Sequence, residues 1–148
     1  MRRDRVWLSV ALFACVVLLV SAVPAPAQTV TTTVSVGSQP FAVAVNPITN
    51  KIYVANEGSA TVTVIDGATN ATKTVSVGTN PGTVGVNPVT DKIYVTNRFG
   101  NTVTVIDGAT NATTTVSAGI NPAAVAVNPV TNQIYVANDG SNTVTVID

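Results

Sequence analysis

Charged and aromatic side chains recur at one position of a repeated segment. Glu57, the pair Arg98 and Phe99, and Asp139 each follow a Tyr-Val-(Ala/Thr)-Asn tetrapeptide, and successive copies lie 41 residues apart. Loops on a rigid scaffold are the usual place for ligand-binding residues. We therefore predict a ligand-binding face at these four residues, with Arg98 and Phe99 as a small recognition patch. Sequence drift in solvent-exposed turns is the alternative explanation.

Carboxylates form a second recurring set. Asp66, Asp107 and Asp148 end the same strand-like segment in the three copies. A ring of carboxylates could hold calcium, but Asp before Gly favours a turn in which the side chain accepts bonds from nearby N–H groups. The chain has no His and one Cys, Cys15, so an imidazole base or zinc cluster is excluded. We predict no catalytic residue, no metal ligand and no cofactor, and a protein that is not an enzyme.

The N-terminus has the layout of a secretory signal peptide. Three arginines in the first five residues precede an apolar run over 6–20 and the small-residue stretch Ala25-Pro26-Ala27. This pattern predicts a signal peptide over residues 1–27, cleaved before Gln28. The apolar run is shorter than the roughly 20 residues of a membrane span, although a retained anchor is the alternative. We expect a secreted, periplasmic or cell-surface protein with no membrane contact beyond the signal peptide.

Charge is sparse in the remaining segment. Charged residues make up 9% of the chain, against about 25% in an average domain. No basic stripe is present to bind a phosphate backbone, so nucleic acid is not an expected partner. Asn70 and Asn111 each begin an Asn-Ala-Thr triplet, which is the acceptor pattern for N-glycosylation.

The repeat predicts the fold. Residues 46–86 and 87–127 are identical at 28 of 41 positions, and a period near 40 to 45 built from strand-like segments is typical of a propeller blade. Segments rich in Val, Ile, Thr and Tyr predict strands at 41–45, 51–56, 61–66 and 71–77. The equivalent units begin near residues 82 and 123. We interpret Asn46, Asn87 and Asn128, each before Pro, as structural turn residues.

The repeated segments resemble the YVTN family of β-propeller repeats. The resemblance is carried by "KIYVANEGSATVTVIDGATNATKTVSVG", "KIYVTNRFGNTVTVIDGATNATTTVSAG" and "QIYVANDGSNTVTVID" and covers nearly everything after residue 30. It implies an all-β fold of four-stranded blades in an exported or surface-layer protein. The family's motif residues are structural, so no catalytic position is carried over. Such propellers usually close with about six or seven blades, more than this chain supplies.

The number of strands predicts about three blades. Residues 30–36 resemble the fourth strands at 71–77 and 112–118, whereas the third unit stops after its third strand. Closed propellers have about four to eight blades, so three blades would form an open fan with exposed apolar end faces. One solution is a homodimer in which two fans close a six-bladed ring and strand 30–36 completes the last blade of the other chain. A fragment of a longer propeller and a stable lone fan are the alternatives.

These observations favour an exported, non-enzymatic β-propeller module that serves as a binding or interaction scaffold at the cell surface or in the periplasm. Its expected partner is a protein or cell-envelope ligand. One alternative is part of a periplasmic propeller enzyme, or an oxidoreductase accessory subunit, whose catalytic groups come from further blades or a partner. A structural surface-layer component is the other.

Overall fold

Short strands alternate with tight turns throughout the repeats. We describe a computed structural model, in which residues 28–148 are placed; the predicted signal peptide lies outside these described residues. The strands of the first unit are β1 (Pro40–Asn46), β2 (Lys51–Asn56), β3 (Thr61–Asp66) and β4 (Thr72–Ser76), with a 3-10 turn at Glu57–Ser59. The later strands are β5 (Pro81–Asn87), β6 (Lys92–Asn97), β7 (Thr102–Asp107), β8 (Thr113–Ser117), β9 (Pro122–Asn128), β10 (Gln133–Asn138) and β11 (Thr143–Ile147).

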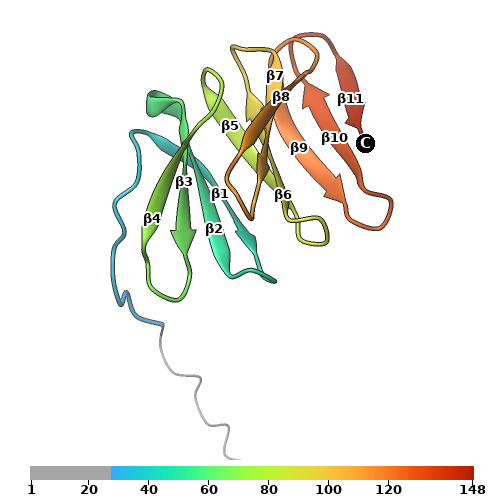
Figure 1. Cartoon of the computed structure of the whole chain (residues 1–148). Coiled ribbons are helices and arrows are strands. Elements are labelled where there is room, and N and C mark those ends of the chain that lie inside the picture. The colour runs from blue at the N-terminus through green and yellow to red at the C-terminus, as the bar shows by residue number, and fades with distance from the viewer. Residues whose placement is uncertain (1–27) are drawn as a thin grey trace, which may run out of the picture. The chain divides into compact units, whose positions relative to one another are not determined.

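The strands form three antiparallel sheets, one for each unit. Two sheets have four strands in sequential order, β1-β2-β3-β4 and β5-β6-β7-β8, and the third has the order β9-β10-β11. Residues 33–148 form one compact unit, in which β5 packs against β1 on one side and β9 on the other (Figure 1). The predicted all-β fold of about three propeller blades is therefore confirmed. We call the three sheets blade 1, blade 2 and blade 3.

Alternating side chains of each blade build the core between blades. Tyr53 pairs with Ala44 and Val64 across the sheet, and side chains on this face of blade 1 pack against Ile93, Val95 and Ile106 of blade 2. The second cluster repeats the arrangement, with Tyr94 and Val103 of blade 2 against Ile134 and Val136 of blade 3. Each blade thus has a tyrosine face, directed toward the next blade, and an isoleucine face, directed toward the preceding one.

Asparagine, rather than glycine, makes the left-handed turns of the described segment. No glycine there has a positive φ, whereas eleven other residues do, eight of them asparagine. Asn101 and Asn142 have φ of 52° and 53° in the loops after the second strands, and Ala60 holds the same conformation with φ of 51°. Asparagine tolerates this region because its short polar side chain bonds locally, whereas alanine is strained there.

One predicted strand is not formed. Residues 28–36 make no strand in the structure, so the predicted outer strand at 30–36 is wrong for a single chain. A strand needs a neighbouring edge to pair with, and the blade that would offer this edge is not supplied next to blade 1. Blade 3 correspondingly leaves the outer edge of β11 unpaired. No helix in the described part of the chain is long and apolar enough to cross a membrane.

Candidate ligand-binding face

The loops after the second strands lie beside the segments that cross from one blade to the next. The N–H groups of Glu57, Arg98 and Asp139 donate to the carbonyl oxygens of Gln39, Asn80 and Asn121 at 2.9, 3.0 and 3.0 Å. These three acceptors all have positive φ, from 52° to 56°. The crossing residue and the loop of each blade are therefore fixed to each other at one face of the fan.

A continuous polar network joins the predicted ligand residues across the blades. Asn80 Nδ2 donates to Glu57 Oε1 at 2.5 Å, which ties the first crossing back to blade 1. Arg98 Nε donates to Asn121 Oδ1 at 3.3 Å, and Asn121 Nδ2 donates to Asp139 Oδ2 at 3.3 Å. The structure thus brings Arg98 and Asp139 together through Asn121.

Sequence reasoning missed the two asparagines of this network. Asn80 and Asn121 each lie two residues after Gly78 or Gly119 and directly before a proline. This sequence context indicates a turn and gives no sign of a contact with another blade. The signal that could have identified them is the change from asparagine to Gln39 at the equivalent position before blade 1. The backbone of Asn121 is also fixed, because its N–H donates to Asn101 Oδ1 at 2.9 Å.

Phe99 is strongly exposed on this face. Its side chain is 74% exposed, and Arg98 beside it is half-buried while Asp139 is exposed. An open hollow of about 410 Å³ adjoins Asp139 and is lined also by Ala137, Asn142 and Val144. The face therefore offers an aromatic ring, a guanidinium and carboxylates on a fixed backbone, which can bind a ligand but form no acid–base pair with a nucleophile.

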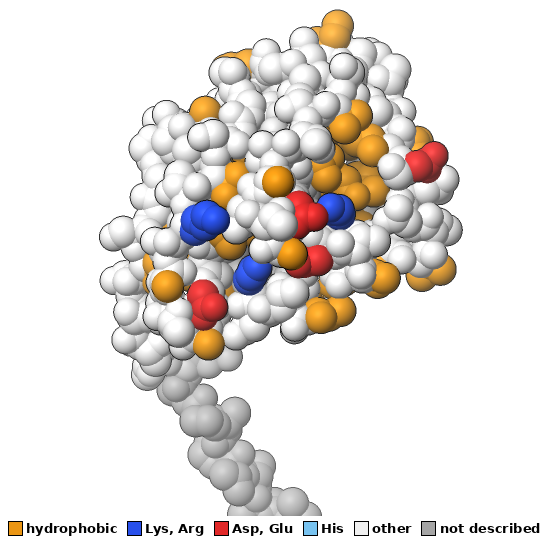
Figure 2. All heavy atoms as spheres, viewed as in Figure 1, with side chains coloured by type: hydrophobic (Ala, Val, Ile, Leu, Met, Phe, Trp, Pro, Cys, Tyr) orange, Lys and Arg blue, Asp and Glu red, His pale blue; other side chains and the backbone are white. Residues whose placement is uncertain are grey.

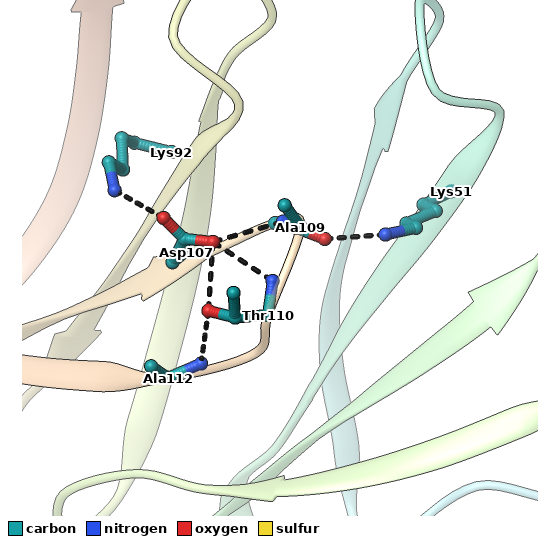
Figure 3. Close-up of polar contacts among 7 residues, drawn as sticks. Lys51, Lys92, Asp107, Ala109, Thr110 and Ala112 are labelled. Carbon is teal, nitrogen blue, oxygen red and sulfur yellow. Dashed lines mark hydrogen bonds and ion pairs between the residues drawn. The ribbon is translucent and has the colours of Figure 1, made fainter.

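The recurring aspartates are turn residues (Figure 3). Asp107 Oδ1 accepts bonds from the N–H groups of Ala109 and Thr110 and from the Thr110 hydroxyl, at 3.1, 2.9 and 2.9 Å. Asp107 Oδ2 forms an ion pair with Lys92 Nζ at 2.6 Å, and this bond is the main reason that the pKa of Asp107 lies far below its usual value. No group of three His, Cys, Asp or Glu residues within 28–148 is arranged to hold a metal.

Asp66 repeats the same turn in blade 1. Its Oδ1 accepts from the N–H groups of Ala68 and Thr69 and from the Thr69 hydroxyl, and the bonds from Thr69 lower the pKa of Asp66. Lys51 Nζ reaches across to blade 2 and donates to the Gly108 carbonyl at 2.5 Å. Asp66 and Asp107 therefore stabilise hairpins within their own blades, and Lys51 joins blade 1 to the Asp107 turn of blade 2.

The two predicted glycosylation positions differ in accessibility. Both Asn70 and Asn111 sit in the turn before a fourth strand with φ of 61° and 62°. Asn70 is exposed, whereas Asn111 is half-buried and lines a hollow with Lys51 and Lys73 of blade 1. Only Asn70 presents a freely accessible acceptor amide.

The blades align with solved β-propeller-like structures. Hydrazine synthase from Kuenenia stuttgartiensis aligns with a TM-score of 0.70 at 24% identity, over 80% of this chain and 35% of that one. A 6-phosphogluconolactonase-like protein from Bacteroides fragilis aligns with 0.65 at 23% identity, over 78% and 36%. A nidogen/laminin complex aligns with 0.62 at 11% identity, over 72% and 42%. These likenesses define the class of the fold, a β-propeller, of which this chain supplies a part.

No family model and no curated protein matches the sequence. The propeller implied by the YVTN resemblance is confirmed as a fold, and membership of that family stays a prediction. The chain spans 35% to 42% of the solved chains named above.

The comparisons correct one prediction. The absence of catalytic residue types led us to predict that the protein is not an enzyme, yet neighbours of the same architecture are enzymes, among them hydrazine synthase and 6-phosphogluconolactonase-like proteins. The prediction that the protein is not an enzyme is therefore wrong, because neither the fold nor the composition supports it. The physical reason is that function resides in sites placed on a fold, and the residues of three blades do not limit what a larger propeller can do.

Proposed function

We propose that this chain is a YVTN-type repeat module of an exported β-propeller, which binds a cell-envelope ligand through the face that carries Arg98 and Phe99. The polar network of this face carries the proposal: Glu57 bonds to Asn80, the Arg98 N–H bonds to the Asn80 carbonyl, and Arg98 is joined through Asn121 to Asp139. It fixes residues that vary between otherwise near-identical repeats, and fixed side chains lose little entropy on binding.

The composition of the face favours a ligand with sugar rings and carboxylates. The exposed ring of Phe99 offers a flat apolar surface, and the adjacent guanidinium suits a carboxylate partner. Peptidoglycan presents both groups, since its sugar chains carry acidic peptides. Peptidoglycan is a polymer of the bacterial cell envelope, which connects the proposed ligand with the export predicted from the N-terminus.

Co-sedimentation with purified peptidoglycan sacculi tests the proposal. The double variant Arg98→Ala/Phe99→Ala should bind at least about tenfold more weakly than the wild-type chain, because aromatic and arginine anchors each contribute about 1–2 kcal/mol or more. The matched control Lys73→Ala/Val89→Ala also removes one cation and one exposed apolar side chain, away from these loops, and should bind normally. A wild-type chain that stays in the supernatant, or equal losses in the two variants, would reject this assignment.

A further inference from the structure

The two end faces of the fan are more exposed than the equivalent surfaces inside it, although Val54 and Ile65 on the isoleucine face of blade 1 are buried. On the isoleucine face of blade 1, Val43 is 66% exposed, and on the tyrosine face of blade 3, Val144 is 59% exposed. Their counterparts at the inner contacts are packed, since Val62 and Val103 are fully buried and Val84 and Val125 join the two core clusters. On the side of the molecule drawn in Figure 2, hydrophobic side chains also gather where the middle sheet adjoins the C-terminal sheet. Each end face therefore has the shape and chemistry that the opposite end face requires.

We propose that the end faces bind each other in a second copy of this chain, so that blade 3 of each chain packs on blade 1 of its partner and two chains close one six-bladed ring. The inner contacts of the fan specify this interface residue by residue. Two kinds of polar contact form at both inner interfaces. The residues for a third contact of each kind lie on the two end faces, where they do not meet within a single chain.

The first of these polar contacts joins the ends of the inner strands to the next blade. Asn46 Nδ2 donates to Asp91 Oδ1 at 2.7 Å, and Asn87 Nδ2 donates to Asn132 Oδ1 at 2.9 Å. Asn128 is the third donor in register and Asn50 the third acceptor. Asn46 and Asn87 are fully buried, whereas Asn128 is half-buried and makes no bond from Nδ2 within residues 28–148. A second copy supplies Asn50 to Asn128.

The second polar contact lies at the loop face. Glu57 pairs with Asn80, and Arg98 pairs with Asn121, in each case a loop residue with the crossing residue of the next blade. Asp139 and Gln39 hold the third pair of positions, and the carboxylate of Asp139 can accept from the amide of Gln39. Pro81 and Pro122, which follow the inner crossings, are buried, but Pro40 is exposed. The open hollow over Ala137 and Val144 is the surface on which Pro40 of a second copy would pack.

The segment before blade 1 is positioned so that residues 30–36 could pair with β11 of a second copy. The N–H of Gly37 donates to Thr63 Oγ1 at 3.3 Å, as Gly78 does to Thr104 at 3.4 Å and Gly119 to Thr145 at 3.2 Å. In the last two cases the residues just before the glycine form the outer strand of the preceding blade. Residues 30–36 repeat that strand sequence, and β11 offers the free edge it would pair with.

For two copies of this 148-residue chain, the proposed contact can close a ring. Two fans give six blades, inside the range of about four to eight observed for propellers, whereas three fans would give about nine. A head-to-tail contact that does not close would instead grow into an open filament. We therefore expect a closed dimer and no longer assembly.

Cysteine crosslinking tests contact and closure together. The full chain with Cys15→Ser, Gln39→Cys and Asp139→Cys is treated with a short bis-maleimide. Closure by two chains predicts one covalent dimer band and no ladder. As a control for register, Glu57→Cys with Asn80→Cys should crosslink within the chain and migrate as a monomer. A ladder of higher bands would overturn closure by two chains, and an uncrosslinked monomer would overturn the contact.

Light scattering during size exclusion provides the second test, with the mass of the purified chain taken from mass spectrometry. The wild type should have twice the chain mass. Val144→Lys should raise the dimer dissociation constant at least about tenfold, since an unpaired charge would be buried at the interface. Val130→Lys introduces the same charge at a turn residue that is 91% exposed and should leave the dimer intact. A wild-type monomer, or a dimer that Val144→Lys leaves unchanged, would overturn the proposal.

Discussion

The side-chain amide of Asn46 donates from Nδ2 to Oδ1 of Asp91, 2.7 Å away in the next blade, while its own oxygen accepts from the N–H groups of Ile48 and Thr49. One fully buried side chain thus closes a hairpin and joins two blades. The asparagine before proline, interpreted from the sequence as a turn residue, has a second role that only the packing of blades creates.

Breaking this interblade bond should weaken the contact between blades 1 and 2. We expect Asn46→Ala and Asp91→Ala each to lower the free energy of unfolding by about 1–3 kcal/mol, because a bond to a charged acceptor is lost and a buried polar group is left unpaired. Urea unfolding of the two single variants and the double variant gives the coupling energy, expected to be about 1 kcal/mol. Additivity within about 0.3–0.5 kcal/mol would show that the two side chains do not interact.

Because of the ion pair between Lys92 and Asp107, the free energy of unfolding should fall at low pH. The lowered pKa of Asp107 means that its carboxylate stabilises the fold above its unfolded pKa of about 3.9, and that this contribution is lost as pH falls through the lower folded pKa. In NMR titrations, Lys92→Ala should raise the pKa of Asp107, while the Thr110 bonds keep it below the usual value. An unchanged pKa in Lys92→Ala would contradict the ion pair.

The buried tyrosine of blade 1 should affect stability at high pH. Burial, with a smaller effect of Asp91 and Asp107, raises the pKa of Tyr53 to about 12. The unfolded chain therefore loses this proton at about pH 10 while the folded chain keeps it, so stability should fall as pH rises from about 10 to about 12.

Tyr53→Phe should reduce this alkaline dependence and leave the part that comes from Tyr94, whose pKa burial also raises. The Tyr53 hydroxyl is buried without a hydrogen-bond partner in the described part of the chain, so its removal should leave the free energy of unfolding at pH 7 unchanged or raise it by up to about 1 kcal/mol. Urea unfolding at several pH values measures both effects. A clear loss of stability at pH 7 would mean that the hydroxyl has a partner, such as an ordered water.

The N-terminal segment should direct export. Residues 1–27 fused to alkaline phosphatase lacking its own signal should give periplasmic activity in a bacterial host, and mass spectrometry of the full chain should find a mature N-terminus at Gln28. Substitution of Arg2, Arg3 and Arg5 by Glu should reduce export by removing the positive n-region. Cytoplasmic retention of the unaltered fusion would contradict the prediction.

The strands could be predicted closely because each is defined by its own residues. The segments 51–56 and 61–66 agree with β2 and β3, and the first and fourth strands differ by only one residue at each end. Alternating Val, Ile and Thr between Asn, Pro and Gly turns requires no information from the rest of the chain.

Features that depend on a neighbouring blade could not be predicted in this way. Asn80 and Asn121 are ordinary turn residues until the next blade places Glu57 or Arg98 within reach. Residues 30–36 have the sequence of an outer strand, but a strand forms only where an edge is available, and β-propensity reflects packing against neighbours more than the backbone alone. Tyr53 and Tyr135 occupy the same repeat position, yet one is fully buried and the other 38% exposed, because only one has a following blade.

The near-equivalence of the two inner interfaces has a consequence for how such a protein grows over evolutionary time. A duplication or loss of one whole unit of 41 residues would create no new kind of contact, since the tyrosine face of any blade meets the isoleucine face of the next. The tight packing at Gly85, where a Cβ atom would come within 3.1 Å of Val125 and Val127, lies inside one such junction. Gene length can therefore drift by complete units, and selection for ring closure then decides which lengths persist.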